Sequence, residues 1–402
     1  MKRYISGKPV SNIKDVLHDG QDYILILDEG CLEHLDEIKS RHPVAALSDY
    51  ALVFSHVPSY FQMLSIPVFF IPENKNRAYV TYYEQTHTVA ESIRAKAIST
   101  LEEIRSISTI TIDTFLNVVY PGVVEAIDNQ IYSEDAGYKV RTSIKTNDDF
   151  NFASVNADGI GMIFTEFVFF DYTTYPTYKE QRETLDRILT NNRNGNYTIR
   201  LFDINHDKIP KWLHGVKLGN YNHPLFERFF IDYLNEQLRC ICDLAKKYPI
   251  SILIPYVKSA ADVDYIRNCI DECGSPYREK VKLGAMVENV SIVDEMSYMQ
   301  NTIDFFSVGT NDLIHSFFDI ERTHILKPEQ MIRISNDKNF WELLRNIQQV
   351  AAATPIRVGG QLPIYPEALE RLVEIGYKQF TIGPQWVKQI KHQLANLSFT
   401  KE

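Results

Sequence analysis

The sequence has little of what marks several common classes of protein. It contains only five cysteines, Cys31, Cys240, Cys242, Cys269 and Cys273, and their spacing fits no zinc ribbon. No uninterrupted apolar run is long enough to span a bilayer. The N-terminal stretch MKRYISGKPVSNIKD lacks the apolar core of a signal peptide. These absences predict a cytoplasmic protein with reduced thiols and no membrane partner.

The sequence also has fewer positively charged than negatively charged residues. The 402 residues carry 42 Lys and Arg against 52 Asp and Glu, which gives a net charge of −10. Because no basic stripe is present, nucleic acid is excluded as a partner. The N-terminal part has no Gly-rich loop of the kind that cradles nucleotide phosphates, which argues against ATP binding. What the chain does have is 45% hydrophobic residues, enough for a large core.

The order of apolar and amphipathic segments divides the chain into three parts. Residues 1–85 hold short β-type runs between polar and helical pieces, which predicts a small α/β domain. Residues 86–137 contain TVAESIRAKAISTLEEIRS, whose apolar spacing predicts a helical connector. In residues 138–402, eight apolar runs alternate with longer amphipathic segments, which predicts a parallel (β/α)8 TIM barrel. The eight runs are YKVRTSI, GIGMIFTE, YTIRLFDI, ISILIPYV, KLGAMVE, DFFSVGT, IRVGGQ and KQFTIG.

Polar residues gather where these runs end, and the chemistry of such barrels lies at the C-terminal ends of the strands. Thr165, Glu166, Asp203, Glu288, Asn311 and Asp312 all stand at such ends. Glu288 and Asp312 offer the carboxylate oxygens that Mg2+ prefers. Arg200, Lys208 and Arg322 could then gather an anionic substrate around the metal. One such residue alone is more often a rim ion pair, but a set at successive strand ends favours a site.

Several segments of residues 138–402 occur in an order that is typical of one enzyme family. LGAMVEN followed by VDEMSYMQNTIDFFSVGTNDLIHSFFDIER resembles the barrel signature of the phosphoenolpyruvate (PEP)-utilising enzymes, which include enzyme I of the sugar phosphotransferase system and pyruvate-phosphate dikinase. ADGIGMIFTEFVFFD, TIRLFDINHDKIP and RVGGQLPIYPEALERLVEIGYKQFTI are similar to the same family. The resemblance covers about residues 138–397 and implies a phosphohistidine swivelling domain followed by the (β/α)8 barrel.

The resemblance also implies roles for individual residues. Glu288 and Asp312 would be the Mg2+ ligands. The substrate, PEP or a pyruvate-like acid, would be bound by four residues, Arg200, Asp203, Asn311 and Arg322, and Arg200 and Lys208 would act in catalysis. A family barrel of this kind commonly pairs, so a homodimer is the expected assembly.

The segment SHVPSYFQMLSIPVFFI resembles the phosphohistidine motif of the same family. It aligns without a gap and places Ser55 and His56 on the family's Ser-His pair. A neutral imidazole nitrogen can attack a phosphoryl group. The resemblance therefore implies that His56 receives the phosphoryl group and passes it to an acceptor, either a protein or a small molecule.

Three departures from the family pattern keep other functions open. Phe164 stands where the family has a phosphate-clamp arginine. The position of a second phosphate-clamp arginine of the family falls near Tyr221. Gly359 replaces the cysteine that protonates the enolate carbon. The alternatives are a Mg2+-dependent enzyme acting on a 2-oxo acid, such as a lyase, and a degenerate PEP- or pyruvate-binding regulatory protein.

Overall fold

The structure is a computed structural model of the chain. It describes residues 4–11, 22–27, 34–49, 61, 66, 68–71, 101–113, 118–122, 137–145, 157–190, 196–203, 210–213, 228–272, 281–320, 334 and 336–399. The chain divides into two compact units. One comprises residues 1–134 with 324–335 and 398–402, and the other comprises residues 135–323 with 336–397.

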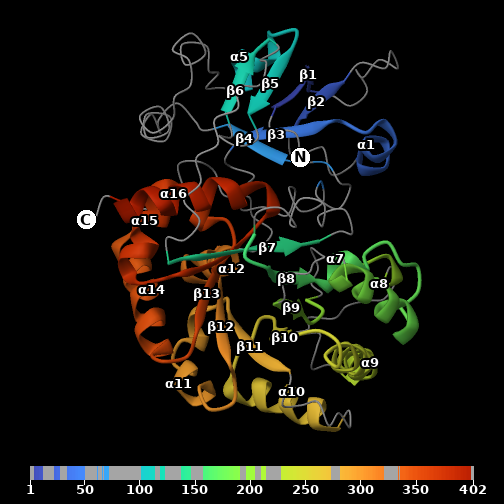
Figure 1. Cartoon of the computed structure of the whole chain (residues 1–402), viewed down its shortest axis with the longest axis vertical. Coiled ribbons are helices and arrows are strands. Elements are labelled where there is room, and N and C mark those ends of the chain that lie inside the picture. The colour runs from blue at the N-terminus through green and yellow to red at the C-terminus, as the bar shows by residue number, and fades with distance from the viewer. Residues whose placement is uncertain are drawn as a thin grey trace. The chain divides into compact units, whose positions relative to one another are not determined.

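The first unit is built on a six-stranded sheet with the order β4-β3-β2-β1-β5-β6 (Figure 1). Strands β1 to β4 are parallel, whereas β5 is antiparallel to β1 and to β6. Its core contains aliphatic side chains such as Ile24, Leu47 and Ile112 together with Phe69. The strands are β1 (Tyr4–Val10), β2 (Tyr23–Ile26), β3 (Ala45–Asp49), β4 (Val68–Ile71), β5 (Ile110–Asp113) and β6 (Val118–Pro121), and the helices are α1 (Leu35–Arg41) and α5 (Leu101–Arg105).

This unit differs in one respect from the expectation for residues 86–137. Helix α5 lies in that stretch, but β5 and β6 are strands that extend the sheet from β1. The pattern ITID and VVYP is β-branched and apolar, so it completes the hydrophobic face of the sheet and cannot serve as a solvated helix. The boundaries of a swivelling domain at residues 1–85 stay a prediction.

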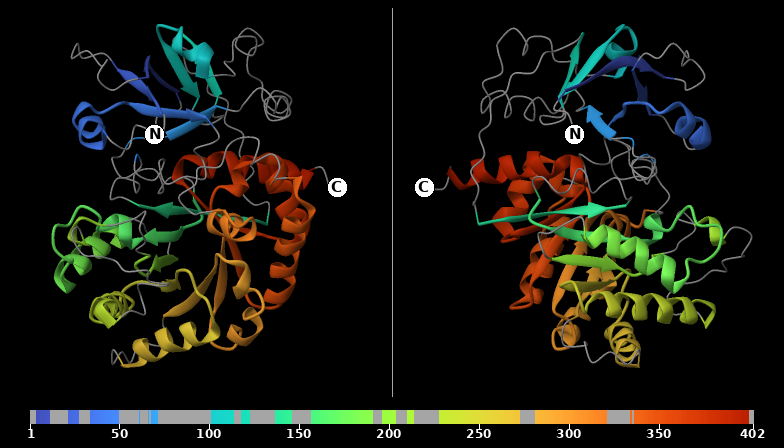
Figure 2. Two further views of the ribbon diagram at one scale, coloured as in Figure 1. Left: turned by 180° about the vertical axis from the view of Figure 1, so that it is seen from behind. Right: turned by 45° about the vertical axis from the view of Figure 1, so that its right-hand side comes forward.

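The second unit is a closed barrel of eight parallel strands in the order β7-β8-β9-β10-β11-β12-β13-β14 (Figures 1 and 2). Each of the eight predicted runs forms one strand, which confirms the TIM-barrel prediction. The strands are β7 (Lys139–Ile144), β8 (Ile160–Phe164), β9 (Tyr197–Arg200), β10 (Ile250–Ile254), β11 (Lys282–Val287), β12 (Phe305–Gly309), β13 (Ile356–Gly359) and β14 (Gln379–Ile382). Backbone hydrogen bonds between all neighbouring strands hold the barrel closed.

Helices follow the strands and cover the outside of the barrel (Figure 2). They are α7 (Thr165–Val168), α8 (Tyr178–Thr190), α9 (Arg228–Leu244), α10 (Ala260–Glu272), α11 (Met296–Met299), α12 (Thr310–Phe317), α14 (Lys338–Ala351), α15 (Pro366–Ile375) and α16 (Val387–Phe399), with 3-10 turns at Lys211–Leu213, Val290–Ile292, Leu362–Ile364 and Pro384–Trp386. Among the described helices, none is both long and apolar enough to cross a membrane.

The cysteines of this unit behave as small hydrophobic residues. Cys240 and Cys242 on α9 and Cys269 on α10 are buried free thiols. Burial raises the pKa of Cys240 to about 12, so the thiol stays protonated at neutral pH. Cys31 and Cys273 lie outside the described residues.

The barrel interior is tightly filled, and a glycine makes one of its contacts possible. A Cβ atom added at Gly284 would lie 2.3 Å from the Phe305 ring, whereas one added at Gly359 would have its nearest neighbour at 3.5 Å. We predict that Gly284→Ala lowers the free energy of unfolding by about 1–3 kcal/mol through overpacking. Gly359→Ala, the matched control, should cost less. Urea unfolding of both variants measures this, and equal losses would contradict it.

Candidate active site

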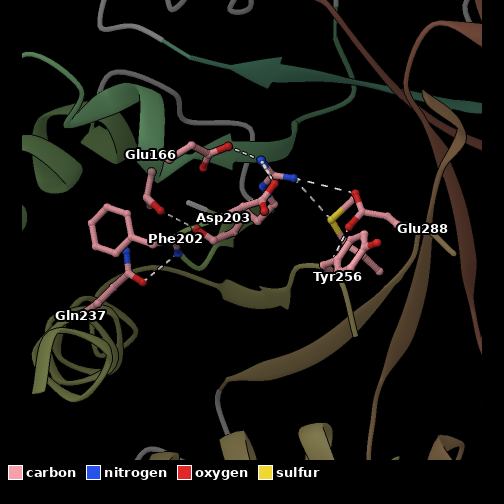
Figure 3. A network of polar contacts seen from close by, with 9 residues as sticks. Glu166, Phe202, Asp203, Gln237, Tyr256 and Glu288 are labelled. Atoms are coloured by element: carbon pink, nitrogen blue, oxygen red, sulfur yellow. Dashed lines mark hydrogen bonds and ion pairs between the residues drawn. The ribbon is translucent and has the colours of Figure 1, made fainter. Parts of the chain in front are cut away.

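A buried arginine at the C-terminal end of β9 forms a charged network with Glu166, Asp203 and Glu288, the three carboxylates labelled in Figure 3. Arg200 is the last residue of the strand and is only 2% exposed. Its Nη2 forms an ion pair and hydrogen bond with Glu166 Oε1 and lies 3.1 Å from Asp203 Oδ2. Its Nη1 lies 3.9 Å from Glu288 Oε1. One guanidinium thus draws together acidic side chains that follow three strands of the barrel, β8, β9 and β11.

The surroundings of Arg200 fix its charge. Burial by itself lowers the pKa of this guanidinium, but Glu166, Asp203 and Glu288 outweigh that effect and raise the pKa above its usual value. The group is therefore permanently cationic. Taken by themselves, these four buried residues carry two negative charges in excess, and buried charge of one sign is costly unless it is neutralised.

The backbone around the network is held by side chains that the barrel supplies. Thr165 Oγ1 donates a hydrogen bond to the carbonyl of Arg200 at 2.7 Å, which joins the end of β8 to the end of β9. Gln237 Oε1 on α9 accepts the N–H of Phe202 at 3.2 Å. Glu288 Oε2 accepts the N–H of Tyr256 at 2.9 Å. Figure 3 shows Glu166 and Asp203 on one side of the network and Glu288 and Tyr256 on the other.

An aromatic side chain lies against the arginine. The Phe164 ring centroid is 4.5 Å from Arg200 Cζ, within the range of a cation–π contact. Lys145, the residue after β7, places its Nζ 5.3 Å from the same ring and 5.4 Å from the ring of Phe167. The face of the Phe164 ring therefore contacts the guanidinium of Arg200. An arginine at position 164 would instead add a second positive charge.

Asn311 and Asp312 lie in the first turn of α12, directly after β12. Asn311 Oδ1 accepts the N–H of Gln361 at 2.8 Å, which ties α12 to the loop after β13. This approach requires Gly360, because a Cβ there would come within 2.7 Å of Asn311 Oδ1 and the backbone has φ +96°. Asp312 is partly buried in the first helical turn, where the helix dipole favours a carboxylate.

The donor set at these strand ends fits a divalent cation of the Mg2+ type. Such an ion takes one or two protein carboxylates and keeps its other positions for water and substrate oxygens. Glu288 is a buried carboxylate that packs against Gly309, where an added Cβ would lie 2.7 Å from its Oε1, and it shares the network around Arg200 with two further carboxylates. The described residues contain no cluster of three or more metal-binding side chains. Glu288 and Asp312 are the two that would hold the ion.

The structure thus brings together Arg200, Asp203 and Glu288 of the residues expected from the sequence. It places Asn311 and Asp312 directly after β12, the strand that neighbours β11 and its Glu288 and lies three strands from β9 in barrel order. His56, Lys208 and Arg322 lie outside the described residues, as does Tyr221.

Two participants in the network have no specific role in the prediction from the sequence. Glu166 was noted as a strand-end residue, yet the structure makes it the direct hydrogen-bonding partner of Arg200. Lys145 was not noted, although it follows the run YKVRTSI as directly as Glu288 follows KLGAMV. The position immediately after a strand run was the available signal in both cases.

With this geometry in place, comparison with known families is informative. Residues 124–399 match the family described as PEP-utilising enzyme, PEP-binding domain. This match covers more than half of the chain, so the chain belongs to the PEP-utilising enzyme family, as the sequence motifs indicated.

The curated relatives are larger proteins. The chain is 25% identical over 254 residues to the phosphoenolpyruvate-protein phosphotransferase of Borreliella burgdorferi, an alignment that covers 59% of this chain and 44% of the relative. It is 27% identical over 265 residues to the protein of the same name from Haemophilus influenzae, with 60% and 44% covered. The chain therefore spans less than half of the length of these relatives.

A solved structure titled as citrate synthase SbnG covers 66% of this chain and 94% of its own, with 15% identity and a TM-score of 0.39. A TM-score of that size supports no inference about this chain.

The network predicts a large penalty for removing its cation. Arg200→Met should lower the free energy of unfolding at pH 7 by about 3–5 kcal/mol, because it leaves buried carboxylates without their partner. Those carboxyls would then have folded pKa values above their unfolded ones, so the deficit should shrink as the pH falls through them. Denaturant unfolding between pH 5 and 8 measures the effect.

The control for that variant is an exposed ion pair. Arg345 lies 2.6 Å from Glu342, and both side chains are largely exposed. Arg345→Met should therefore cost under about 1 kcal/mol at every pH. A similar cost for the two variants would show that the Arg200 network does not stabilise the barrel.

Proposed function

We propose that this chain is a Mg2+-dependent enzyme that takes the phosphoryl group of PEP onto His56 and passes it to an acceptor. The observation that carries the proposal is the buried group of Arg200, Asp203 and Glu288 at the C-terminal strand ends of a barrel in the PEP-binding family. In such barrels the reacting groups lie at this end. The names of the curated relatives add support for phosphoryl transfer as the reaction class.

The proposal gives each described residue a part in substrate binding. Glu288 and Asp312 hold Mg2+, and the bound ion neutralises charge that develops on substrate oxygens. Arg200 offers a guanidinium of fixed charge to the phosphate or the adjacent enolate oxygen. Because Asn311 uses its oxygen to accept from Gln361, its NH2 group is the end that would donate to a substrate carboxylate.

The same proposal assigns parts to residues known here only from the sequence. A nitrogen of neutral His56 attacks phosphorus, the bond between phosphorus and the enol oxygen breaks, and the enolate leaves as the precursor of pyruvate. Lys208 and Arg322 add positive charge around the phosphate and carboxylate. Catalysis of this transfer is mainly a matter of positioning and charge neutralisation.

One contact favours a second candidate function. Phe164 lies against Arg200. Phe164 stands where the family pattern has a phosphate-clamp arginine, so the phosphate side of the site has one cation fewer. Gly359 likewise offers no acid for protonation of an enolate carbon. A Mg2+-dependent enzyme that binds a 2-oxo acid, such as a lyase, would need the carboxylate side of the site and not the phosphate clamp. A regulatory protein would need only to bind PEP or pyruvate.

Further properties belong to the proposal by family analogy alone. They are a homodimer, a cytoplasmic location and a phosphoryl acceptor that is either a partner protein or a small molecule. Light scattering of the purified chain would give the assembly state.

Phosphorylation of His56 is the first test. After incubation with PEP and Mg2+, intact mass spectrometry should show one phosphoryl increment on the wild type and none on His56→Ala, because the imidazole is the only proposed acceptor on the chain. His34→Ala serves as the control, because His34 is a histidine of the same unit that has no proposed role. This variant should show the same phosphoryl increment as the wild type.

The outcomes of that experiment separate the candidate functions. An equal increment on His56→Ala would place the phosphoryl group elsewhere and defeat the proposal as stated. If no increment forms but calorimetry detects Mg2+-dependent binding of pyruvate or oxaloacetate, the 2-oxo-acid function is favoured. Binding without any turnover would favour the regulatory one.

Mg2+ binding gives an independent prediction. Mg2+ at 100 times its dissociation constant should stabilise the wild type by about 2.7 kcal/mol, since a ligand of the folded state adds to the free energy of unfolding. Glu288→Gln and Asp312→Asn should each abolish most of this gain, whereas Asp264→Asn on α10 should keep it. A full Mg2+ response in both site variants would rule out these two ligands.

A further inference from the structure

Two arginines project into the opposite end of the barrel. Arg357 is the second residue of β13, and its Nη1 donates a hydrogen bond at 2.8 Å to Thr198 Oγ1, the second residue of β9. Strands β13 and β9 are four places apart in the closed order of eight, so the side chain crosses the interior. Arg141 on β7 donates to Gln379 Oε1, the first residue of β14, at 2.8 Å. Both contacts lie towards the N-terminal ends of the strands.

This layer is separate from the candidate active site. Thr198 precedes Arg200 by two residues on the same strand, which places the two layers about 7 Å apart along it. An apolar cluster that includes Met162, Leu253 and Met286 lies inside the barrel. None of the residues of this layer has a part in the proposed function.

The charge of the two guanidinium groups is compensated only in part by the described residues. Neither forms an ion pair with a described carboxylate. Asp158 acts on Arg141 electrostatically, but its oxygens are engaged by Lys391 Nζ at 2.9 Å and by the N–H of Val140 at 2.7 Å. Arg357 instead lies over the Phe305 ring, 3.9 Å from its centroid. Burial, and after it the charge of Arg141, lower the pKa of Arg357 to about 9. Two like charges thus share a poorly solvated space.

Donor atoms in the same layer also lack acceptors. Within the described part of the chain, the Nε atoms of Arg141 and Arg357 are buried without a hydrogen-bond partner, and so is Oγ1 of Thr381, a residue only 3% exposed. Thr381 pairs with Arg141 in the register of β14 and β7. Both flank Gly161, where an added Cβ would lie 2.3 Å from Thr381 Oγ1 and 2.9 Å from Arg141 Cβ. Buried polar groups without partners in a native fold call for a ligand or water.

From this arrangement we infer that the N-terminal end of the barrel is an anion-binding site, formed by Arg141, Arg357 and Thr381, for a phosphate-class dianion. Two guanidinium groups balance a dianion, whereas a monocarboxylate would leave one positive charge buried. The planar guanidinium is suited to two-point contact with phosphate oxygens. Both arginine residues are partly exposed to solvent.

Calorimetric titration with inorganic phosphate tests the site. EDTA is included because, without a divalent metal, the acidic network around Arg200 repels anions. We expect one phosphate per chain. Arg357→Met and Arg141→Met should each weaken binding at least tenfold by removing a charged donor, and Thr381→Val should weaken it less. Arg345→Met, at an exposed arginine, should bind phosphate as the wild type does.

Several results would overturn the inference. Absence of phosphate binding to the wild type would do so without any variant, as would unchanged affinity in Arg357→Met. If either methionine variant fails to fold, Thr381→Val, which alters one hydroxyl, together with the wild-type titration still decides the matter. Acetate provides the last comparison. It should bind at least tenfold more weakly than phosphate, and equal affinity would exclude a site for dianions.

Discussion

The attraction between Arg200 and its three carboxylates is the constraint on which the organisation of the barrel's C-terminal end depends. Charges that are almost fully buried must be paired, so Glu166 after β8, Asp203 after β9 and Glu288 after β11 converge on a single guanidinium. The neighbouring backbone follows, because Thr165 binds the Arg200 carbonyl and Tyr256 donates to Glu288. Three carboxylates around one guanidinium make this end of the barrel suitable for a cation together with an anionic substrate.

The interior of the barrel therefore has two polar ends of opposite character. Among the described residues, three carboxylates converge on Arg200, whereas at the other end Arg141 and Arg357 contact the neutral side chains of Gln379, Thr198 and Phe305. Apolar side chains lie within the barrel as well, and their low polarity keeps each set of charges from being screened. A parallel barrel permits this asymmetry because every strand points the same way, so residues early and late in the strands form separate layers.

Particular residues show how far sequence reasoning reached. The eight strand runs were recognisable because each is a short apolar stretch between amphipathic segments, and all eight became strands. Strand-end position found Arg200, Asp203 and Glu288 for the same reason. Strand-end position did not predict the contact between Phe164 and Arg200. The replacement of a family arginine by Phe164 does not indicate where the phenyl ring lies in the folded barrel. Residues 110–121 were assigned to a connector because the helical spacing before them was clear, while pairing with β1, a hundred residues earlier, leaves no local trace.

The sequence by itself determined the barrel, its family and the set of polar residues at one end of it, because hydrophobic periodicity and motif order are local properties of the chain. Only the tertiary structure decided which of those residues meet. Glu166 pairs with Arg200, and Arg357 crosses the interior to Thr198, because closure of the sheet brings together strands that are far apart in sequence. Whether a charge is satisfied is likewise a property of the folded neighbourhood, since burial and partners exist only after the chain has closed.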